Sequence, residues 1–290
     1  MKVPTHILCV CTGNTCRSPM AEALLRAKAA ARGLPLTVHS AGISAFPGDT
    51  ATDLAVEVLR ERGIDLSGHR ATPLTRYACD AADRIVVMTE GHRQVLLSAG
   101  IAADKLTVLG VPDPFGGDLE TYEQAAEAID RELEHLLPPF SVVPMREQHV
   151  EQLARLEQIC FADPWSEEAL EDELHNDAAL FLVAEGPEGA ALGYAGCFVA
   201  ADEASVANVA VAPAARRQGV ASWLLEALKR QAAERGAAQL FLEVRASNEA
   251  AQALYASSGF EPCGRRPQFY REPTEDALLY RAVLGEGESL

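Results

Sequence analysis

The chain has 290 residues, of which 48% are hydrophobic and 23% charged, so it is longer than one ordinary domain and has enough apolar material for two packed cores. Its 25 Lys and Arg residues against 42 Asp and Glu residues give a net charge of −17, which argues against a nucleic-acid-binding or anionic-membrane surface. No run approaches the roughly 18 apolar residues of a membrane span, so we expect a cytosolic protein with no membrane contact.

In the first half of the chain, short apolar runs alternate with helical patterns. We predict strands at residues 6–11, 36–40, 84–88 and 106–109. Helical patterns occupy residues 20–32, 51–62, 92–98 and 122–137. This alternation predicts an α/β fold in which a doubly wound parallel sheet carries helices on both faces.

A proline pair, Pro138-Pro139, interrupts the chain between the last of these helices and a new strand-like segment at 141–144. We therefore predict one domain over residues 1–139 and a second over residues 140–290. The second half carries most of the acidic excess, with 24 acidic against 12 basic residues.

The second half has a different order of elements. We predict helices at residues 146–160, 167–176, 221–235 and 249–258. Strands are predicted at residues 179–185, 191–200, 207–211 and 239–245, followed by closing strands. The pattern predicts a mixed α/β domain with an antiparallel front and a βαβ unit at the back.

The loop between the first strand and the first helix, Cys11–Ser18, is a candidate anion site. Backbone amides of such a turn and of the following helix N-terminus can surround one phosphoryl group. Gly13 and Asn14 are residue types that tolerate the backbone dihedrals this turn needs. Cys11 lies at the base of the loop beside those amides and Arg17, so we expect a thiolate that acts as a nucleophile.

Attack on phosphorus also requires an acid for the leaving group. Asp113 follows the last predicted strand of the first half, on a turn that is stiffened by Pro114 and flanked by Phe115. We predict that Asp113 supplies this proton. No set of Cys, His or carboxylate residues has the spacing of a metal site, so no metal is expected.

The Cys11–Ser18 loop and the Asp113-Pro114 pair resemble the low-molecular-weight protein tyrosine phosphatase family over residues 1 to about 138. His39-Ser40-Ala41-Gly42 and Ser67-Gly68-His69 agree with the same family. The resemblance implies a phosphatase fold and a site that acts on phosphorylated proteins.

Further roles in the loop follow from this resemblance alone. Asn14, Ser40 and His69 would form a hydrogen-bonded brace behind the loop, and Ser18 would help to activate the thiolate. Cys16 has two open interpretations. It is either a small packed residue or the family's second cysteine, which can trap the nucleophile as a disulfide.

The substrate preference depends on one loop position. Tyrosine-directed members usually have a large aliphatic residue where this chain has Thr15, and the segment Cys11-Thr12-Gly13-Asn14-Thr15-Cys16-Arg17-Ser18 resembles the bacterial protein-arginine phosphatase branch. We therefore expect phosphoarginine as the substrate, with phosphotyrosine as the alternative. Arsenate reduction is a weaker alternative, because that activity needs two further cysteines downstream and only Cys79 lies in that region.

A second candidate anion site lies at the start of the helix predicted at 221–235. Arg216-Arg217-Gln218-Gly219-Val220-Ala221 would place free backbone amides and the helix dipole around a diphosphate. The motif resembles the acetyl-coenzyme A turn of the GNAT acetyltransferases.

The segments Leu242–Asn248 and Ala253–Phe260 narrow this resemblance to the ribosomal protein alanine N-acetyltransferases, over residues 141 to about 283. The resemblance implies acetyl transfer from acetyl-CoA to the N-terminal amine of a ribosomal protein. Glu243 would be the base and Tyr255 the acid. The backbone of Val209 and Val211 and the side chain of Asn248 would bind the cofactor.

The hypothesis from the sequence is therefore a bifunctional enzyme with a cysteine-dependent protein phosphatase in one half and an N-acetyltransferase in the other. Its partners would be phosphorylated proteins and a ribosomal protein N-terminus, and the acidic second half suits a cationic peptide. The alternative from another class is that one half is a non-catalytic binding or regulatory module.

Overall fold

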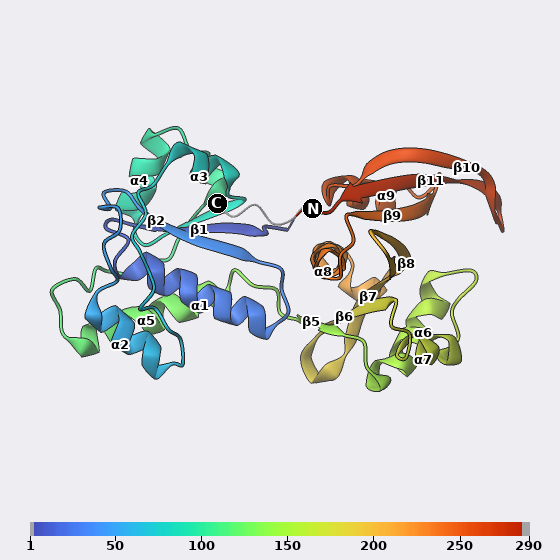
Figure 1. The fold of residues 1–290 in the computed structure, drawn as a ribbon, viewed down its shortest axis with the longest axis horizontal. Helices are drawn as coiled ribbons and strands as arrows, with labels where there is room; N and C mark the ends of the chain where they lie inside the picture. Colours follow the sequence, from blue (N-terminus) through green and yellow to red (C-terminus); the bar gives the residue numbers. More distant parts are fainter. Residues whose placement is uncertain (1–2, 286–290) are drawn as a thin grey trace. The chain divides into compact units, whose positions relative to one another are not determined.

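The computed structural model describes residues 3–285, which form two compact units (Figure 1). One unit contains Pro4–Ala31 and Leu36–Pro138, and the other contains the chain from Pro139 onward together with Arg32–Pro35. The short segment joins the second unit because the carbonyl oxygen of Arg32 accepts a 2.7 Å hydrogen bond from the amide of Val142. Within residues 3–285, none of the helices has the length and apolar character needed to cross a membrane.

The first unit is built on a four-stranded parallel sheet with the order β2-β1-β3-β4. Its strands are β1 (His6–Cys11), β2 (Thr37–Gly42), β3 (Arg84–Val87) and β4 (Leu106–Val108). After their first residue, β1 and β3 are continuous apolar runs, as is expected where both faces of a parallel sheet are covered. The predicted doubly wound α/β fold is confirmed.

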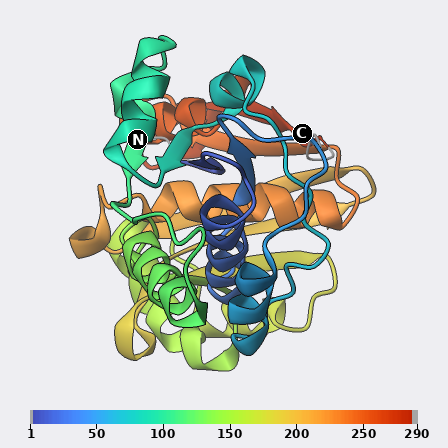
Figure 2. The ribbon, with the colours of Figure 1, turned by 90° about the vertical axis from the view of Figure 1, so that its left-hand side faces the viewer.

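Helices cover both faces of this sheet (Figure 1). One layer contains α1 (Arg17–Ala31), α2 (Asp53–Glu61) and α5 (Leu119–Glu134), and the other contains α3 (Arg76–Ala81) and α4 (Glu90–Ser98), with the helical turn η1 (Ala103–Lys105) before β4. Figure 2 shows α1 and α5 side by side. Lys28 of α1 links them through ion pairs of 3.1 Å to Asp130 and to Glu134.

The four helices predicted in the first half are present, with ends shifted by up to three residues, and one further short helix was not predicted. Helix α1 begins at Arg17 rather than at Met20, because the amide of Met20 already donates to the carbonyl of Cys16 and the loop passes directly into the helix. Helix α3 was not predicted. It has only six residues, and the side chain of its N-cap residue, Thr75, accepts a hydrogen bond from the amide of Ala78. Six residues are too few to show a helical period.

The second unit contains a seven-stranded mixed sheet with the order β10-β11-β9-β8-β7-β6-β5. The strands are β5 (Ser141–Pro144), β6 (Ala179–Glu185), β7 (Ala191–Ala200), β8 (Glu203–Val211), β9 (Gln239–Arg245), β10 (Glu261–Arg271) and β11 (Thr274–Val283). Neighbours are antiparallel except β8 and β9. The predicted mixed α/β fold is confirmed, although β8 begins at Glu203 rather than at Ala207 because its pairing with β7 extends that far.

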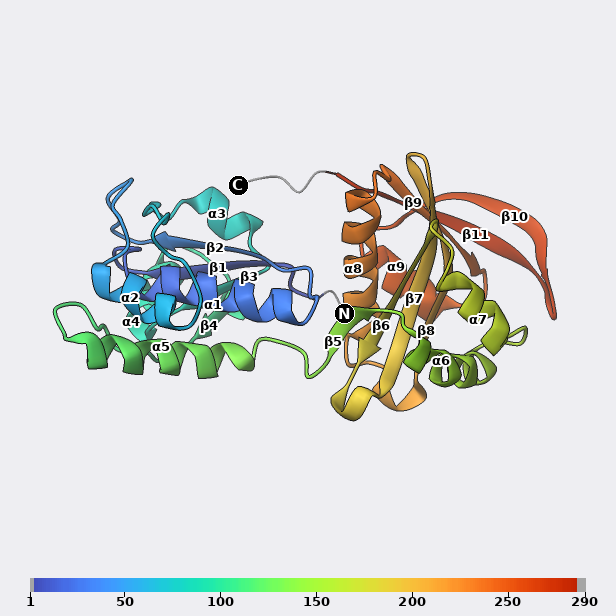
Figure 3. The same cartoon turned by 60° about the horizontal axis from the view of Figure 1, so that its bottom comes forward.

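Helices cover both faces of the mixed sheet as well. Helices α6 (Glu147–Cys160) and α7 (Glu167–Glu173) lie on one face, and α8 (Val220–Glu234) lies on the other (Figure 3). Helix α9 (Glu249–Ser257) connects β9 to β10, and the turns η2 (Pro187–Gly189) and η3 (Pro213–Ala215) flank β7 and β8. An apolar core that includes Leu153, Phe181 and Tyr194 joins α6 to the sheet.

Candidate active sites

The thiol of Cys11 lies at the end of β1, where the chain turns into the loop before α1. Its side chain is buried, and its Sγ lies 3.0 Å from the Oγ of Ser18. The backbone amide of Asn14 donates to the same sulfur at 3.3 Å. Ser18 Oγ accepts a hydrogen bond from Asn14 Nδ2 at 2.9 Å, and its own proton can be donated either to this sulfur or to the carbonyl of Ala41 at 3.4 Å. The sulfur thus has one backbone N–H donor and one neighbouring hydroxyl, and such contacts would stabilise a negative charge on it.

Asn14 forms a buried brace behind this loop. Its φ of 55° lies in the left-handed region, which Asn tolerates better than most residues. Its Nδ2 also donates to Ser40 Oγ at 2.8 Å, and its Oδ1 accepts from the amide of Thr72 at 2.8 Å. His69 Nε2 lies 2.8 Å from the backbone oxygen of Asn14. The structure thus brings Asn14, Ser40 and His69 together and adds Thr72, which the sequence did not point to.

Arg17 is buried and its guanidinium faces the loop. Its Nη1 donates to the carbonyl of Val111 at 3.3 Å, and its Nη2 forms an ion pair with Asp113. Its Nε is buried and has no hydrogen-bond partner in the part of the chain that the structure describes. A buried donor without an acceptor is costly, so this nitrogen fits an oxygen of a bound phosphoryl group.

Asp113 is held at the mouth of the loop by three contacts. Besides Arg17, its carboxylate accepts from the amide of Phe115 at 3.2 Å and lies 3.8 Å from the Sγ of Cys16. Burial, followed by the charge of Cys11, raises the pKa of Cys16 to about 11, so this second thiol stays protonated at neutral pH. Two residues of the Cys11–Ser18 loop, Cys16 and Arg17, therefore contact the carboxyl that was predicted as the acid.

His92 also contacts this loop, although no pattern in the sequence selects it. Its Nε2 lies 3.0 Å from Thr12 Oγ1, and its Nδ1 lies 3.2 Å from Thr89 Oγ1. Burial and then the charge of Arg17 lower the pKa of His92, so the ring is neutral at neutral pH. Thr12 and His92 are 80 residues apart, and no local pattern connects them.

In the second unit, an opening lies between the two parallel strands. β8 and β9 pair only from Glu203 to Ser205, opposite Gln239 to Phe241. Beyond Ser205, β8 continues to Val211 with β7 as its remaining partner, and β9 continues with β11. Beyond Ser205, the edge of β8 that faces β9 is therefore not paired with another strand, and this stretch contains Val209 and Val211, where the cofactor arm was predicted to bind.

The turn before α8 has the backbone geometry of an anion site. Arg217 and Gly219 have φ values of 65° and 82°, which turn successive amides toward the helix start. The first-turn amides of Val220 and Ala221 have no intrahelical acceptor. These groups fit a diphosphate such as that of coenzyme A.

In the turn before α8, the side chains of Arg216 and Gln218 hydrogen-bond to backbone carbonyls and so stabilise the turn. Arg216 Nε donates to the carbonyl of Val211 at 3.1 Å, and Gln218 Nε2 donates to the carbonyl of Ala214 at 2.9 Å. Asn248 likewise caps α9, because its Oδ1 accepts from the amide of Ala251 at 3.1 Å. The predicted contact of Asn248 with the cofactor would therefore have to come from its Nδ2.

Glu243 lies on β9, and its Oε1 pairs with Arg266 Nη1 at 2.7 Å. Tyr255 lies on α9 and is nearly enclosed, with ring centroids 5.9 Å from Phe260 and 6.4 Å from Tyr280. Burial raises the pKa of Tyr255 to about 12, so its hydroxyl stays protonated at neutral pH and can donate a proton.

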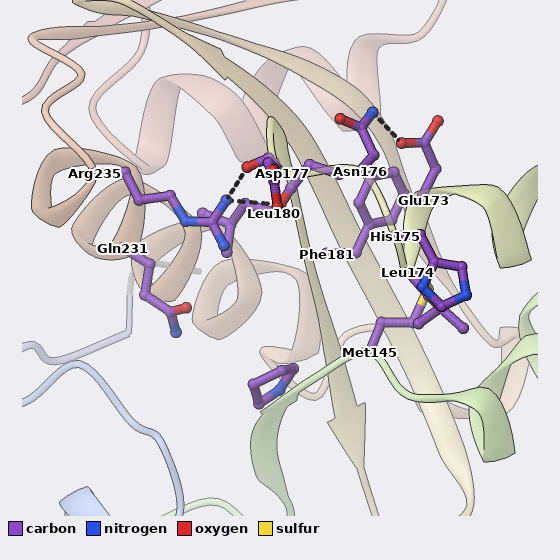
Figure 4. Close-up of a pocket in the computed structure, with 12 residues that line it drawn as sticks. Met145, Glu173, Leu174, His175, Asn176, Asp177, Leu180, Phe181, Gln231 and Arg235 are labelled. Carbon is purple, nitrogen blue, oxygen red and sulfur yellow. Dashed lines mark hydrogen bonds between the residues drawn. The ribbon is translucent and has the colours of Figure 1, made fainter.

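A separate cavity of about 550 Å³ lies where β5 ends and β6 begins (Figure 4). Three of its polar side chains, Arg235, Asn176 and Glu173, already have partners. Arg235 donates to the carbonyls of Asp177 and Ala179, and Asn176 donates to Glu173 at 2.8 Å. None of the predicted site residues lines it.

Comparison with known proteins supports the family predicted for each half of the chain. Residues 6–155 match the family described as low molecular weight phosphotyrosine protein phosphatase, and residues 150–260 match the acetyltransferase (GNAT) family. A protein-arginine-phosphatase from Bacillus subtilis is 42% identical over 140 residues, which cover 45% of this chain and 93% of that protein. The probable low molecular weight protein-tyrosine-phosphatase EpsP from Ralstonia nicotianae is 40% identical over 140 residues, 46% of this chain and 93% of that protein.

For the second half, the [ribosomal protein bS18]-alanine N-acetyltransferase from Escherichia coli is 41% identical over 126 residues, which cover 43% of this chain and 84% of that protein. Both matched families are enzymes, one of protein phosphatases and one of N-acetyltransferases. Since the first match spans more than half of the chain, the protein belongs to the low molecular weight phosphotyrosine protein phosphatase family, and it carries a GNAT acetyltransferase domain in its C-terminal half.

Proposed function

We propose that residues 1–139 form a phosphatase domain that hydrolyses phosphoarginine in proteins, and that residues 140–290 form a domain that acetylates the N-terminal alanine of a ribosomal protein. The observation that carries the first part is the contact of Cys11 Sγ with the amide of Asn14 and the hydroxyl of Ser18, in the same loop as the buried and unpaired Nε of Arg17. The opening between β8 and β9 next to the anion site of α8 carries the second.

In the phosphatase reaction, the thiolate of Cys11 attacks phosphorus while the bond from phosphorus to the leaving nitrogen breaks. Asp113 is the acid that supplies a proton to that nitrogen. Arg17 and the loop amides bind the phosphoryl oxygens, and the protein holds a phosphocysteine. Water then attacks phosphorus with Asp113 as the base, which breaks the bond to sulfur and releases phosphate.

Thr15 supports phosphoarginine over phosphotyrosine. It is half-buried in the loop, and its carbonyl accepts a 2.8 Å hydrogen bond from the amide of Thr52, which fixes its backbone. A threonine leaves more room beside a planar guanidinium than a larger aliphatic residue does, and its hydroxyl can hydrogen-bond to it. Sequence identity does not separate the two substrates, because relatives named for arginine and for tyrosine are almost equally similar.

We expect Thr15→Ile to lower kcat/KM for a phosphoarginine peptide by about 10-fold or more, because one added methylene against a bound group costs about 1–3 kcal/mol. The measurement is phosphate release from matched phosphoarginine and phosphotyrosine peptides. Thr15→Val is the matched control, since it removes only the hydroxyl at nearly constant volume. A wild-type protein that prefers the phosphotyrosine peptide would contradict the arginine assignment and leave the phosphatase assignment intact.

In the acetyltransferase reaction, bound acetyl-CoA supplies an activated thioester. Glu243 would accept one proton from the N-terminal ammonium, which leaves the free amine as the nucleophile. The hydroxyl of Tyr255, which its raised pKa keeps protonated, would supply the proton to the departing thiolate of coenzyme A, and the second proton that the nitrogen loses would return to Tyr255 through solvent. The acidic second half of the chain favours the approach of a cationic peptide.

We expect Gly219→Ala to weaken acetyl-CoA binding by about 10-fold or more, because a side chain at positive φ costs about 1–2 kcal/mol and displaces the amides that hold the diphosphate. Calorimetric titration of the full chain with acetyl-CoA measures this. Gly236→Ala is the matched control, because Gly236 has a φ of 95° at the opposite end of α8. Equal dissociation constants for the two variants would show that the turn before α8 does not bind the cofactor.

A further inference from the structure

A buried carboxylate, Glu157, lies on α6 beneath the sheet of the second unit. It is fully buried, and its hydrogen-bond partners are neutral donors from three segments: the amide of Trp165 at 2.9 Å, the hydroxyl of Tyr194 at 2.5 Å and Nδ2 of Asn208 at 3.2 Å. Burial raises the pKa of Glu157, because the charged form of the carboxyl group carries a desolvation cost in this position. Neither the sequence motifs nor the proposed reaction uses it.

The cluster fixes the orientation of the Asn208 carboxamide. Tyr194 gives its only proton to Glu157, so its oxygen accepts from Asn208 Nδ2 at 3.3 Å. Both contacts of Asn208 on this side therefore require its NH₂ group. The Oδ1 must point away from Glu157, and it accepts no hydrogen bond within residues 3–285.

A β-bulge places Asn208 at the edge of the opening. On β7, the adjacent residues Gly196 and Cys197 pair with Asn208 and with Val206, so Ala207 is an extra residue in β8. The bulge lies just beyond the point where the pairing between β8 and β9 stops. Bulges of this kind redirect side chains next to functional sites.

Asn208 and Glu243 share one face of the sheet on the two sides of this opening. Ala204 and Leu240 are paired in register and both buried, so their side chains point to the same face of the sheet. Side chains alternate along a strand, so Glu243, three residues after Leu240, points to the opposite face. Val206 points with Ala204. Gly196 and Cys197, the β7 partners of Asn208 and Val206, are adjacent in β7 and therefore point to opposite faces of the sheet. The side chain of Asn208 thus points to the face opposite to that of Val206. Both polar groups therefore face the α6 side.

We propose that Asn208 binds the acceptor amine: its Oδ1, held outward by Glu157, accepts a hydrogen bond from the N-terminal nitrogen of the peptide while Glu243 takes the proton from the other side of the opening. This inference rests on the acetyltransferase function proposed above. A neutral amide oxygen orients the nitrogen without the charge that would oppose its deprotonation, which a carboxylate at the same position would do. Asn208 is thus a binding residue, and Glu157 is a positioning residue.

The test is steady-state acetylation of a peptide with an N-terminal alanine by the full chain, combined with calorimetry of acetyl-CoA. We expect Asn208→Leu to lower kcat/KM for the peptide by about 10- to 100-fold, the loss expected for one hydrogen bond to a charged group, and to leave the acetyl-CoA dissociation constant unchanged. The unchanged binding of acetyl-CoA also shows that the variant is folded.

Glu157→Gln tests the positioning role with Asn208 in place. The new NH₂ group can donate where the carboxylate accepted, so the Asn208 carboxamide turns its Oδ1 inward and kcat/KM for the peptide falls by a similar factor. Gln152→Ala is the matched control, because it removes hydrogen bonds from α6 to Gly189 and Ala191 at the start of β7 and should leave the peptide KM unchanged.

The outcomes separate the two proposals. An active wild type with an equally active Asn208→Leu variant would overturn the role of Asn208 alone. A variant that loses acetyl-CoA affinity in parallel with peptide turnover would also overturn it, because Asn208 would then serve only the folding of β8. A wild type that transfers no acetyl group to any N-terminal amine would overturn the acetyltransferase proposal and this inference with it.

Discussion

Cys11→Ser is expected to reduce phosphate release from a phosphoarginine peptide by about 10⁴-fold or more, the scale of loss when an enzyme's nucleophile is removed. The amide of Asn14 and the hydroxyl of Ser18 are arranged to stabilise a charged sulfur, and a serine hydroxyl is not ionised at neutral pH. The measurement is single-turnover and steady-state hydrolysis with the full chain.

Two controls make this result specific. Cys79→Ser removes another buried thiol of the same unit and should retain hydrolysis. Acetyl transfer by the Cys11→Ser protein should equal that of the wild type, which shows that the chain is folded. Retention of more than a tenth of the wild-type rate in Cys11→Ser would contradict nucleophilic catalysis at this residue.

Glu243→Gln is expected to lower kcat for peptide acetylation by about 10²- to 10⁴-fold at neutral pH, the usual contribution of a general base. The carboxamide can still hydrogen-bond to Arg266, so the local structure and acetyl-CoA binding should persist. As the pH rises above about 8, the ordinary pKa of an N-terminal amine, the substrate deprotonates by itself and the variant should recover part of the lost rate.

Glu226→Gln is the matched control for this variant, because Glu226 also pairs with a cation, Lys229 at 2.8 Å, but lies on α8. It should acetylate the peptide at the wild-type rate. If Glu243→Gln lost activity equally at every pH, its carboxylate would not act as the base, and the ion pair with Arg266 would be the feature to explain.

The sequence alone was most informative about the sites whose residues are contiguous in the chain. Cys11–Ser18 and Arg216–Ala221 are each contiguous, so residue type and spacing alone indicate an anion site at a helix start. Asn14, Ser40 and His69 could be grouped only through a family resemblance, because they lie on separate segments. In the structure, Asn14 hydrogen-bonds to Ser40 and its backbone oxygen lies beside His69.

The residues that sequence reasoning missed are joined by long-range contacts. Thr72 hydrogen-bonds to Asn14, which is 58 residues away in the chain, and Asn208 hydrogen-bonds to Glu157, which is 51 residues away. Such pairs depend on strand register and on a bulge, which local periodicity does not report. The opening between β8 and β9 also depends on strand register, because it exists only where the pairing of β8 with β9 stops while β8 stays paired with β7 and β9 with β11.

The most direct test of the account is to trap the phosphoryl group on the protein. The Asp113→Ala variant lacks the carboxylate that assists both steps, so rapid quenching of this variant with a phosphoarginine peptide, followed by peptide mass spectrometry, measures which side chain is modified. We predict a phosphorylated peptide that contains Cys11 and its disappearance in the Cys11→Ser, Asp113→Ala double variant. Phosphate release without any adduct, or an adduct on another residue, would contradict the proposed mechanism.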